Sequence, residues 1–426
     1  MATATKTFKN FIGGEWVDAA SGETFETTQP RDRRGARRLP RSRAPRTSTA
    51  PSRRPRRPTR SGGSSRRRAA ARSSSASAQL LAERKDEVAE LMAREMGKVL
   101  PEAAGDVQEA IDMSYYMGGE GRRLFGQTTP SELRDKFNMS VRQPIGVVGV
   151  ITPWNFPIAI PSWKIAPALV CGNTIVFKPA TDTPLLGERF VELLVEAGVP
   201  AGVINVVHGG GGEVGDRLVR HPDVPVITLT GSRETGVAVL EARGARTSKH
   251  VHLELGGKNA IIVLDDADLD LAVEGIVWSA FGTSGQRCTA ASRVIVQEGV
   301  YEELQKRLVG AAEKLRLGPG WEEGVDVGPV INRRALEKIH SYTEIGVDEG
   351  AKLLTGGEVA ERQRARRREL LPPDHLRRRR PADARRPGGD LRPDDGADPR
   401  ARTSTTRSGS RTGSSSASRR RSSRVT

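Results

Sequence analysis

The stretch NTIVFKPATDTPLLGERFVELLVEAG, residues 173–198, predicts a strand followed by a helix. Its first half is a short apolar run that ends at Lys178, and its second half carries apolar residues at helical spacing. The runs GVINVVHG, PVITLTGS and NAIIVLDD follow and alternate with helical segments. Because apolar strands separated by helices are typical of βαβ units, this order predicts an α/β fold with a doubly wound parallel sheet.

Weaker patterns surround these units. Alternating apolar and polar residues around Gly13 and Gly14 predict a hairpin within residues 6–29. Apolar residues at helical spacing predict a helix from Gln79 onward. The remaining expected elements are a helix over residues 106–123, a pair of strands within 127–144, a helix through Trp278, a strand at SRVIVQEG and a helix over 300–315.

Charge is distributed unevenly along the chain. The 426 residues carry a formal net charge of +16, and the sequence pI is near 10.4. Residues 31–76 hold 17 arginines and one acid, and residues 361–426 hold 20 arginines and eight acids, so the rest of the chain is net acidic. Neither block contains Lys, Ile, Phe, Tyr, Trp or Met, and such segments have little with which to build a core. We therefore expect both blocks to be disordered Arg-rich segments.

The origin of these blocks has two interpretations. A nucleic-acid-binding arm usually contains Lys, and often aromatic residues for stacking. These blocks have neither, so we expect no nucleic-acid partner.

A shifted reading frame in GC-rich DNA is the preferred hypothesis for the origin of both blocks. Residues 389–393, GDLRP, can be encoded GGA GAT CTT CGG CCC, which one nucleotide later gives Glu-Ile-Phe-Gly-Pro. Residues 72–77 give an apolar helix in the neighbouring frame in the same way.

The two cysteines, Cys171 and Cys288, are far apart in the sequence, so we expect neither a disulfide framework nor a metal site. This usage fits a reduced, cytoplasmic setting. No apolar run approaches the roughly 18 residues of a membrane span, so we expect no membrane partner. Cys171 lies in the apolar run ALVCGNT and is expected to be a small buried residue.

Three side chains are candidates for covalent chemistry. Cys288 lies among small residues in SGQRCTAA, where a substrate could approach a nucleophilic thiolate. Glu254, in the apolar strand of HLELGGKNA, is a candidate general base, because apolar surroundings suit a carboxylate to that role. Asn155, in the Pro-bracketed turn of ITPWNFPIAIP, could donate to a developing oxyanion. Taken singly, each of the three could instead be structural.

Two further motifs are candidates for binding a nucleotide. Lys178 ends a buried strand, at the carboxyl edge where α/β sheets bind their ligands. The run LTGSRETG, residues 229–236, puts Gly231 and Ser232 between a strand and a helix, where backbone N–H groups can face a phosphate. It is not a GxGxxG fingerprint, so the order of the motifs carries more weight than any single one.

TPWNFP, FKPA, TGSRETG, LELGGK and GQRC, in this order and with 34 residues from Glu254 to Cys288, resemble the aldehyde dehydrogenase superfamily. The resemblance implies that Cys288 attacks an aldehyde to give a thiohemiacetal, while Asn155 and the Cys288 N–H form the oxyanion hole. It implies that Glu254 activates the water that hydrolyses the thioester, which favours a hydrolytic enzyme over the coenzyme A-acylating branch. Lys164, in PSWKIAP, resembles a family lysine near this site.

The resemblance also implies an NAD or NADP cofactor. Lys178 resembles the lysine that binds the adenine-side ribose, and Gly231 and Ser232 resemble the turn that contacts the pyrophosphate. Thr181 stands where many NAD-preferring members have a Glu that would repel a 2′-phosphate, so we expect NADP to be accepted. The other expected cofactor residues are Trp154, Leu255 and Gly256.

Domains, substrate and partners follow from the same resemblance, which is strongest to semialdehyde dehydrogenases, the α-ketoglutaric semialdehyde type among them. Arg287 could pair with a substrate carboxylate or form a structural salt bridge. The expected regions are a nucleotide-binding domain over 1–255 with oligomerisation strands at 127–144, a truncated catalytic domain over 256–360, and the Arg-rich C-terminal segment over 361–426. A homo-oligomer is expected for the intact fold. An inactive dinucleotide-binding remnant and a basic nucleic-acid-binding protein on an enzyme scaffold are the alternatives.

Overall fold

The computed structural model describes residues 9–20, 24–27, 37–40, 63–243 and 249–360. Its principal sheet has the strand order β11-β10-β7-β8-β9-β1-β2, in which β7 to β11 are parallel and β1 is antiparallel to β9 and β2. The strands of this sheet are β1 (Asn10–Ile12), β2 (Glu15–Val17), β7 (Val147–Ile151), β8 (Thr174–Lys178), β9 (Ile204–Val206), β10 (Val226–Gly231) and β11 (His250–Leu255). The predicted doubly wound parallel sheet is confirmed.

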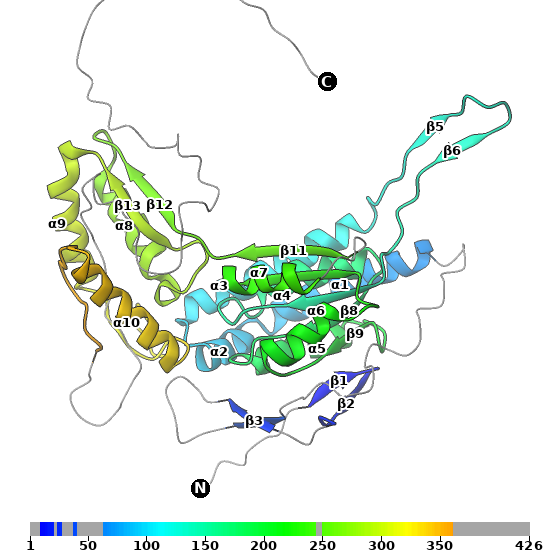
Figure 1. Ribbon diagram of the computed structural model, residues 1–426, viewed down its shortest axis with the longest axis horizontal. Coiled ribbons are helices and arrows are strands. Elements are labelled where there is room, and N and C mark those ends of the chain that lie inside the picture. The colour runs from blue at the N-terminus through cyan, green and yellow to red at the C-terminus, as the bar shows by residue number, and fades with distance from the viewer. Residues whose placement is uncertain (1–8, 21–23, 28–36, 41–62, 244–248, 361–426) are drawn as a thin grey trace, which may run out of the picture. The chain divides into compact units, whose positions relative to one another are not determined.

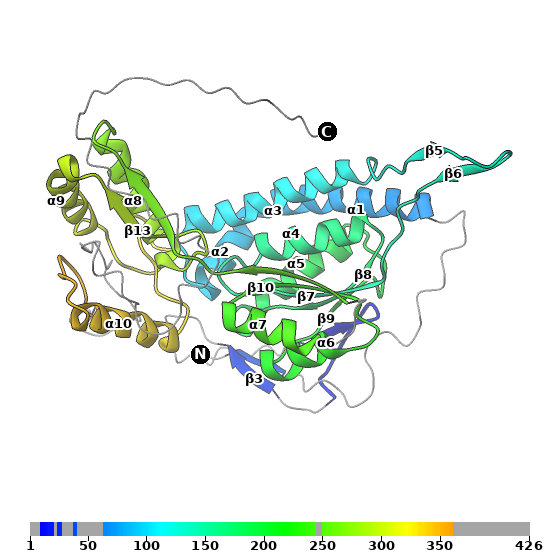
Figure 2. The same cartoon turned by 45° about the horizontal axis from the view of Figure 1, so that its top comes forward.

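Helices cover both faces of this sheet (Figures 1 and 2). On one face lie α1 (Gly63–Glu83), α2 (Lys85–Glu95), α3 (Leu100–Glu120), α4 (Ala159–Val170) and α5 (Pro184–Glu196). On the other lie α6 (Asp216–Arg220) and α7 (Arg233–Ala242). Side chains alternate between the two cores along each strand, so that Ile175 and Phe177 of β8 join one core and Val176 joins the other.

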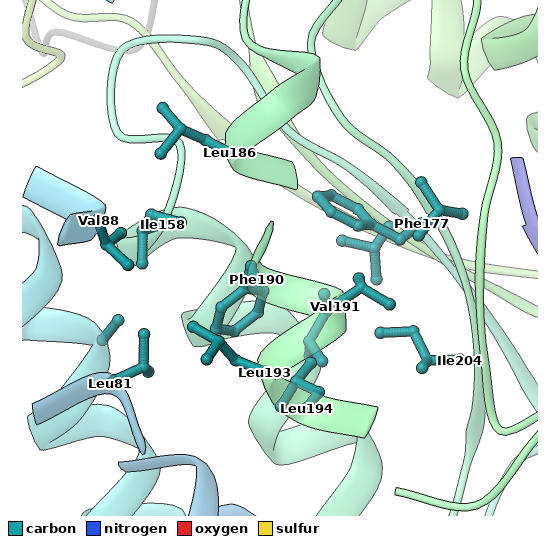
Figure 3. Close-up of a cluster of buried hydrophobic side chains, with 14 of the residues drawn as sticks. Leu81, Val88, Ile158, Phe177, Leu186, Phe190, Val191, Leu193, Leu194 and Ile204 are labelled. Atoms are coloured by element: carbon teal, nitrogen blue, oxygen red, sulfur yellow. The ribbon is translucent and has the colours of Figure 1, made fainter. Parts of the chain in front are cut away.

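The larger core is the one beneath α5, and Figure 3 shows its packing. Phe177 and Ile204 extend from the sheet toward Phe190 and Leu194 of α5, and all four side chains are almost fully buried. Each buried aliphatic or aromatic side chain stabilises the fold by about 1.5–3 kcal/mol through the loss of apolar surface from water. This packing fixes the carboxyl ends of the strands, where the candidate site residues lie.

A second α/β unit follows β11. Its strands β12 (Asn259–Val263) and β13 (Ala291–Val296) form a two-stranded parallel sheet. A small core joins these strands to the first two of the unit's helices, through Val263, Ile276 and Leu304. The helices are α8 (Leu269–Phe281), α9 (Tyr301–Ala312) and α10 (Arg333–Asp348).

The expected hairpins form. Gly13 and Gly14 make the turn between β1 and β2 with φ of 66° and 98°, in the region that favours glycine. The pair expected within 127–144 is β5 (Thr128–Pro130) with β6 (Phe137–Met139), a ribbon that extends away from the sheet in both views. The predicted second helix is longer than expected, because α3 begins at Leu100 with Pro101 in its first turn.

Disorder throughout residues 31–76 was a wrong expectation. β4 (Arg37–Pro40) pairs with β3 (Thr24–Thr27), and α1 begins at Gly63 rather than at Gln79. Small side chains explain the packing of α1, because Ala71 and Ser75 lie directly against Gly118 of α3, and Ala71 also lies against Gly121, the residue that follows this helix. The expected disorder of 361–426 lies outside the described residues. In the part of the chain that the structure describes, no helix is long and apolar enough to cross a membrane.

Candidate active site

Asn155 lies in the turn between the fully buried strand β7 and helix α4, as the sequence predicted. Its Nδ2 donates a hydrogen bond of 2.9 Å to the backbone O of Gln286, two residues before Cys288. Its Oδ1 is buried and has no hydrogen-bond partner among the residues that the structure describes. The carboxamide carries two N–H groups, so one remains to donate to an oxygen that develops negative charge near Cys288.

Cys288 follows a strained loop that the sequence did not predict. Thr283, Ser284 and Gly285 have φ of 54°, 57° and 72°, in the left-handed region. Each non-glycine residue there costs about 1–2 kcal/mol, so surrounding contacts must hold the loop. Ser284 Oγ donates to Gly328 O at 2.7 Å. The loop leaves Cys288 half-buried, with its backbone O accepting from the side chain of Asn259 at 2.7 Å.

Arg287 forms the structural salt bridge that was one of its two expected roles. Its guanidinium donates to Oε1 of Glu102 at 2.8 Å and lies 4.4 Å from the ring centroid of Trp278. Its side chain is only 8% exposed. Arg287 is therefore already committed to a carboxylate of its own chain.

Glu254 is not buried in an apolar strand, so this expectation was wrong. β11 is the edge strand of the sheet, and its side chains alternate between half-buried and exposed, with Glu254 on the exposed face. Its carboxylate is electrostatically coupled to Lys164 of α4. Lys164 Nζ donates to Thr228 Oγ1 at 3.1 Å, and Thr230 is the register partner of Glu254 on β10. The contact between Glu254 and the Cys288 thiol stays a prediction.

Lys164 is half-buried in this arrangement. Burial lowers its pKa to about 8, and the nearby charge of Glu254 acts in the opposite direction. Near neutral pH the ammonium is therefore mostly protonated, and it loses its proton as the pH rises through about 8. It supplies a positive charge to the polar face that carries Glu254.

Lys178 lies at the carboxyl end of β8, as predicted, and is almost fully buried. Its Nζ donates to the backbone O of Pro179 at 2.9 Å and of Gly209 at 3.0 Å. Burial lowers its pKa to about 8, while Asp182 opposes the shift. Thr181 is exposed and shares the carbonyl of Gly209 with Lys178 through a bond of 3.4 Å.

His208 is a buried neighbour of Lys178 that the sequence did not indicate. Its Nε2 lies 3.0 Å from Oε1 of Glu188. Burial, and then the charge of Lys178, lower the pKa of His208 to about 3, so the imidazole is neutral at physiological pH. The proximity to Glu188 is accordingly a polar contact of a neutral ring and not an ion pair. Lys178, and not His208, therefore supplies the positive charge of this cluster near pH 7.

The turn after β10 leads directly into the N-terminus of α7. Ser232 caps α7 by accepting from the backbone N–H of Thr235 at 3.2 Å, and Gly231 is the last residue of β10. Gly210 and Gly211, in the separate loop that follows β9, have open space where a Cβ would lie, so a ligand could approach the backbone of that loop closely. The open glycine backbone, the capped helix and buried Lys178 together fit a dinucleotide.

The remaining expected cofactor residues lie near the same edge of the sheet. Trp154 is half-buried beside Asn155 in the turn after β7. Leu255 ends β11 as the register partner of Gly231, and its side chain packs against Gly236 of α7. Gly256 follows and is exposed. Most of the predicted site residues therefore lie at the carboxyl ends of parallel strands of the main sheet, whereas Lys164 lies in α4 and Cys288 precedes β13 of the second sheet.

Comparison with known proteins agrees with this arrangement. The aldehyde dehydrogenase family model matches residues 16–374. The chain is 41% identical to the α-ketoglutaric semialdehyde dehydrogenase of Bacillus subtilis strain 168, over 84% of this chain and 73% of that protein. It is 40% identical to the NADP⁺-dependent succinate-semialdehyde dehydrogenase of Escherichia coli K12, over 82% of this chain and 72% of that protein.

A solved structure shares the fold. An NADP-dependent enzyme from E. coli superimposes with a TM-score of 0.77 and 37% identity, covering 86% of this chain and 75% of that one. The chain therefore belongs to the aldehyde dehydrogenase family. It is an NAD(P)-dependent aldehyde dehydrogenase, as the order of its motifs predicted.

Proposed function

We propose that this enzyme oxidises a semialdehyde that carries a second, carboxylate end to the corresponding dicarboxylate. The hydrogen bond from Asn155 to the loop of Cys288 is the main support for the proposed catalytic roles, because it brings an amide donor close to the segment of the nucleophile. The relatives that act on α-ketoglutaric and succinic semialdehydes support the substrate class.

The first step is nucleophilic attack at the carbonyl carbon. The Cys288 thiolate forms the C–S bond of a thiohemiacetal, and the carbonyl oxygen takes up the electron pair of the broken π-bond. The free N–H of the Asn155 carboxamide and the backbone N–H of Cys288 donate to this oxygen. Removing one such donor from an oxyanion site usually costs a factor of about 100–1,000 in rate.

NAD(P)⁺, when bound, would accept a hydride from the thiohemiacetal carbon, and the electron pair of the oxyanion would re-form the carbonyl, which leaves a thioester on Cys288. Lys178, Thr181 and the turn of Gly231 and Ser232 hold the cofactor, with Trp154, Leu255 and Gly256 completing the site. Because Thr181 presents no carboxylate to a 2′-phosphate, NADP⁺ is accepted. In this scheme 1–255 is the nucleotide-binding domain and 256–360 the catalytic domain.

Release of the product requires water. Glu254 takes a proton from a water molecule, which attacks the thioester carbonyl, so that the C–S bond breaks and the thiolate of Cys288 is regenerated. The exposed position of Glu254 on β11 leaves it accessible to water. Lys164 supplies positive charge near Glu254.

The ribbon of β5 and β6 is proposed as the contact between copies of this chain. Phe137 and Met139 of β6 are 71% and 64% exposed, which is unusual for large apolar side chains and typical of an interface. Replacing Phe137 with Asp should lower the molar mass measured by light scattering. An unchanged mass would remove this strand from the interface.

We also infer that the Arg-rich blocks at 31–76 and 361–426 come from shifts of the reading frame. The support is the recovery of Glu-Ile-Phe-Gly-Pro from residues 389–393 one nucleotide later. Resequencing the gene across codons 30–78 and 358–426 tests this. DNA that confirms every arginine codon would end the inference.

A substrate panel tests the proposed activity. The full chain is assayed for NAD(P)H formation at 340 nm with α-ketoglutaric, succinic and glutaric semialdehydes, and with propanal and benzaldehyde, each with NAD⁺ and with NADP⁺. We expect the highest kcat/KM for one of the three semialdehydes. A preference for the uncharged aldehydes would contradict the substrate class, and no turnover with any aldehyde would contradict the activity.

A further inference from the structure

Glu102, in the first turn of α3, reaches the loop that carries Cys288 with both oxygens of its carboxylate. Oε2 accepts from the backbone N–H of Thr283 at 2.7 Å and from its hydroxyl at 3.3 Å. Oε1 accepts from the guanidinium of Arg287 at 2.8 Å. Glu102 is 185 residues away from Arg287 in the sequence, so these bonds join two distant parts of the chain at the residue before the nucleophile.

One of the two residues that Glu102 contacts has a strained backbone. Thr283 has the left-handed φ of 54° and is almost fully buried, so its N–H depends on an acceptor within the protein. Arg287 Nε donates to the hydroxyl of the same threonine at 2.9 Å. A Cβ at Gly282 would lie 2.7 Å from the guanidinium of Arg287 and 2.8 Å from the carboxylate of Glu102, so a larger residue there would displace this ion pair.

The next turn of α3 contacts the segment that carries Asn155, the proposed oxyanion donor. Asp106 lies four residues after Glu102, which puts the two carboxylates on one face of the helix. Its Oδ1 accepts from the backbone N–H of Ala159 at 2.7 Å, at the start of α4 and four residues after Asn155. Its Oδ2 accepts from Lys98 at 2.7 Å, and both of these side chains are fully buried.

Lys98 completes the support of the Asn155 turn. Its Nζ lies 3.7 Å from the centroid of the ring of Phe156, the residue after Asn155. A fully buried ion pair is costly to separate, so this turn has one strongly preferred position relative to α3. One face of α3 thus contacts the turn of the oxyanion donor through Asp106 and the loop of the nucleophile through Glu102.

We propose that Glu102 is a positioning residue for Cys288, which sets the distance of its thiol from the Asn155 amide by fixing the 283–287 loop on α3. This rests on the proposed roles of Cys288 and Asn155. Glu102 touches neither substrate nor cofactor and acts through Thr283 and Arg287. The competing explanation is a salt bridge that only stabilises the fold, in which case its removal would lower stability and leave turnover per folded molecule unchanged.

A graded pair of substitutions separates these explanations. Glu102→Gln keeps an oxygen that can accept from Thr283 but loses the charge that pairs with Arg287, and Glu102→Ala loses both. We expect kcat to fall about 10-fold in Glu102→Gln and about 100-fold in Glu102→Ala, because a misplacement of about 1 Å has effects of that size. KM for the cofactor should stay within about threefold, because Lys178 and the β10–α7 turn are untouched.

The control is Glu303→Gln together with Glu303→Ala. Glu303 is an exposed carboxylate of α9 that accepts from Arg307 at 2.7 Å, so the same chemical change breaks an ion pair remote from the loop. Both control variants should keep kcat within about twofold of the unsubstituted chain, since exposed pairs contribute little. Concentrations of folded protein are matched by circular dichroism before each assay.

Hydrogen exchange reports on the loop without relying on activity. In Glu102→Ala, the peptide that contains Thr283 should exchange its amides at least about 10-fold faster, while the peptide that contains Asn155 should be unchanged because Asp106 still holds it. Unchanged exchange at Thr283, or faster exchange with kcat within threefold, would overturn the proposal. Absence of turnover in the unsubstituted chain would instead overturn the proposed function.

Discussion

The seven-stranded sheet and the two-stranded sheet differ in how completely they are buried. Every residue of β7 in the seven-stranded sheet is buried, whereas Ile262 of β12 and Ile295 of β13 in the two-stranded sheet are 59% and 41% exposed. The cofactor residues follow strands that apolar packing holds on both faces. The nucleophile loop instead depends on single polar contacts, from Glu102, Gly328 and Asn155. Apolar packing thus sets the positions of the cofactor residues, and hydrogen bonds set the position of the loop that carries Cys288.

The largest effect should come from the hydrogen-bonded loop that carries Cys288. Cys288→Ala removes the nucleophile, and we expect kcat to fall by at least about 10⁴-fold, since loss of a catalytic nucleophile costs about this much or more. Cys171→Ala, in the other half-buried cysteine, is the matched control and should leave NADPH formation within about twofold. Retained turnover in Cys288→Ala would remove this loop from the chemistry.

One substitution made in both sheets tests the difference in packing directly. Ile175→Ala, in β8, removes a fully buried side chain and should lower the free energy of unfolding by about 2–5 kcal/mol. Ile262→Ala, in β12, removes a side chain that is already mostly exposed and should lower it by no more than about 0.5 kcal/mol. Urea unfolding followed by tryptophan fluorescence measures both, and equal losses would break the comparison.

Asn155 follows a strand of the packed sheet and is bonded to the loop of Cys288. Its removal should therefore lower the rate of the reaction more than the affinity for the cofactor. We expect Asn155→Ala to lower kcat by a factor of about 100–1,000, the usual loss for an oxyanion donor. The dissociation constant of NADP⁺, measured by quenching of tryptophan fluorescence, should change by less than about threefold. A large loss of cofactor affinity with normal kcat would show that Asn155 serves the nucleotide instead.

The smallest effect should be the pH dependence of NADP⁺ affinity, which we attribute to Lys178 in the packed sheet. Lys178, with a pKa of about 8, is charged below that pH and loses its charge as the pH rises above it. NADP⁺ affinity should therefore be flat from pH 6.5 to 7.5 and fall about threefold to tenfold by pH 9, because an ionic contact with the 2′-phosphate is lost. Calorimetric titration measures this, and Lys178→Arg, which stays charged, should make the profile flat. A fall of equal size in that variant would assign the effect to another group.

The sequence predicted most of the sheet because each central strand is an apolar run that ends at a polar or glycine residue. Lys178, Gly231 and Asn155 lie where those runs predicted them, after strands of one sheet. Glu254 was misjudged because apolar neighbours in a sequence do not distinguish an edge strand from a central one. The helical start of α1 was missed because arginine dominates the composition there, while the small residues that pack on α3 are Ala71 and Ser75.

The support of the nucleophile could not be predicted from one sequence. Thr283 and Ser284 have a left-handed backbone, which a sequence normally indicates only by a glycine at the position itself. Neither residue is a glycine, so their conformation could not be predicted. The partner of Arg287 is Glu102, and a separation of 185 residues hides the pair from any local pattern. Such bonds depend on the packing of α3 against the loop, which only the tertiary structure specifies.

Covalent trapping at Cys288 tests the central claim most directly. Glu254→Gln is mixed with a semialdehyde and NADP⁺, quenched with acid, and digested for peptide mass spectrometry. We predict one equivalent of NADPH per subunit in a burst, and an added mass equal to the acyl group on the peptide that contains Cys288. An acyl group on any other residue, or a full burst in Cys288→Ser with no adduct, would contradict the account.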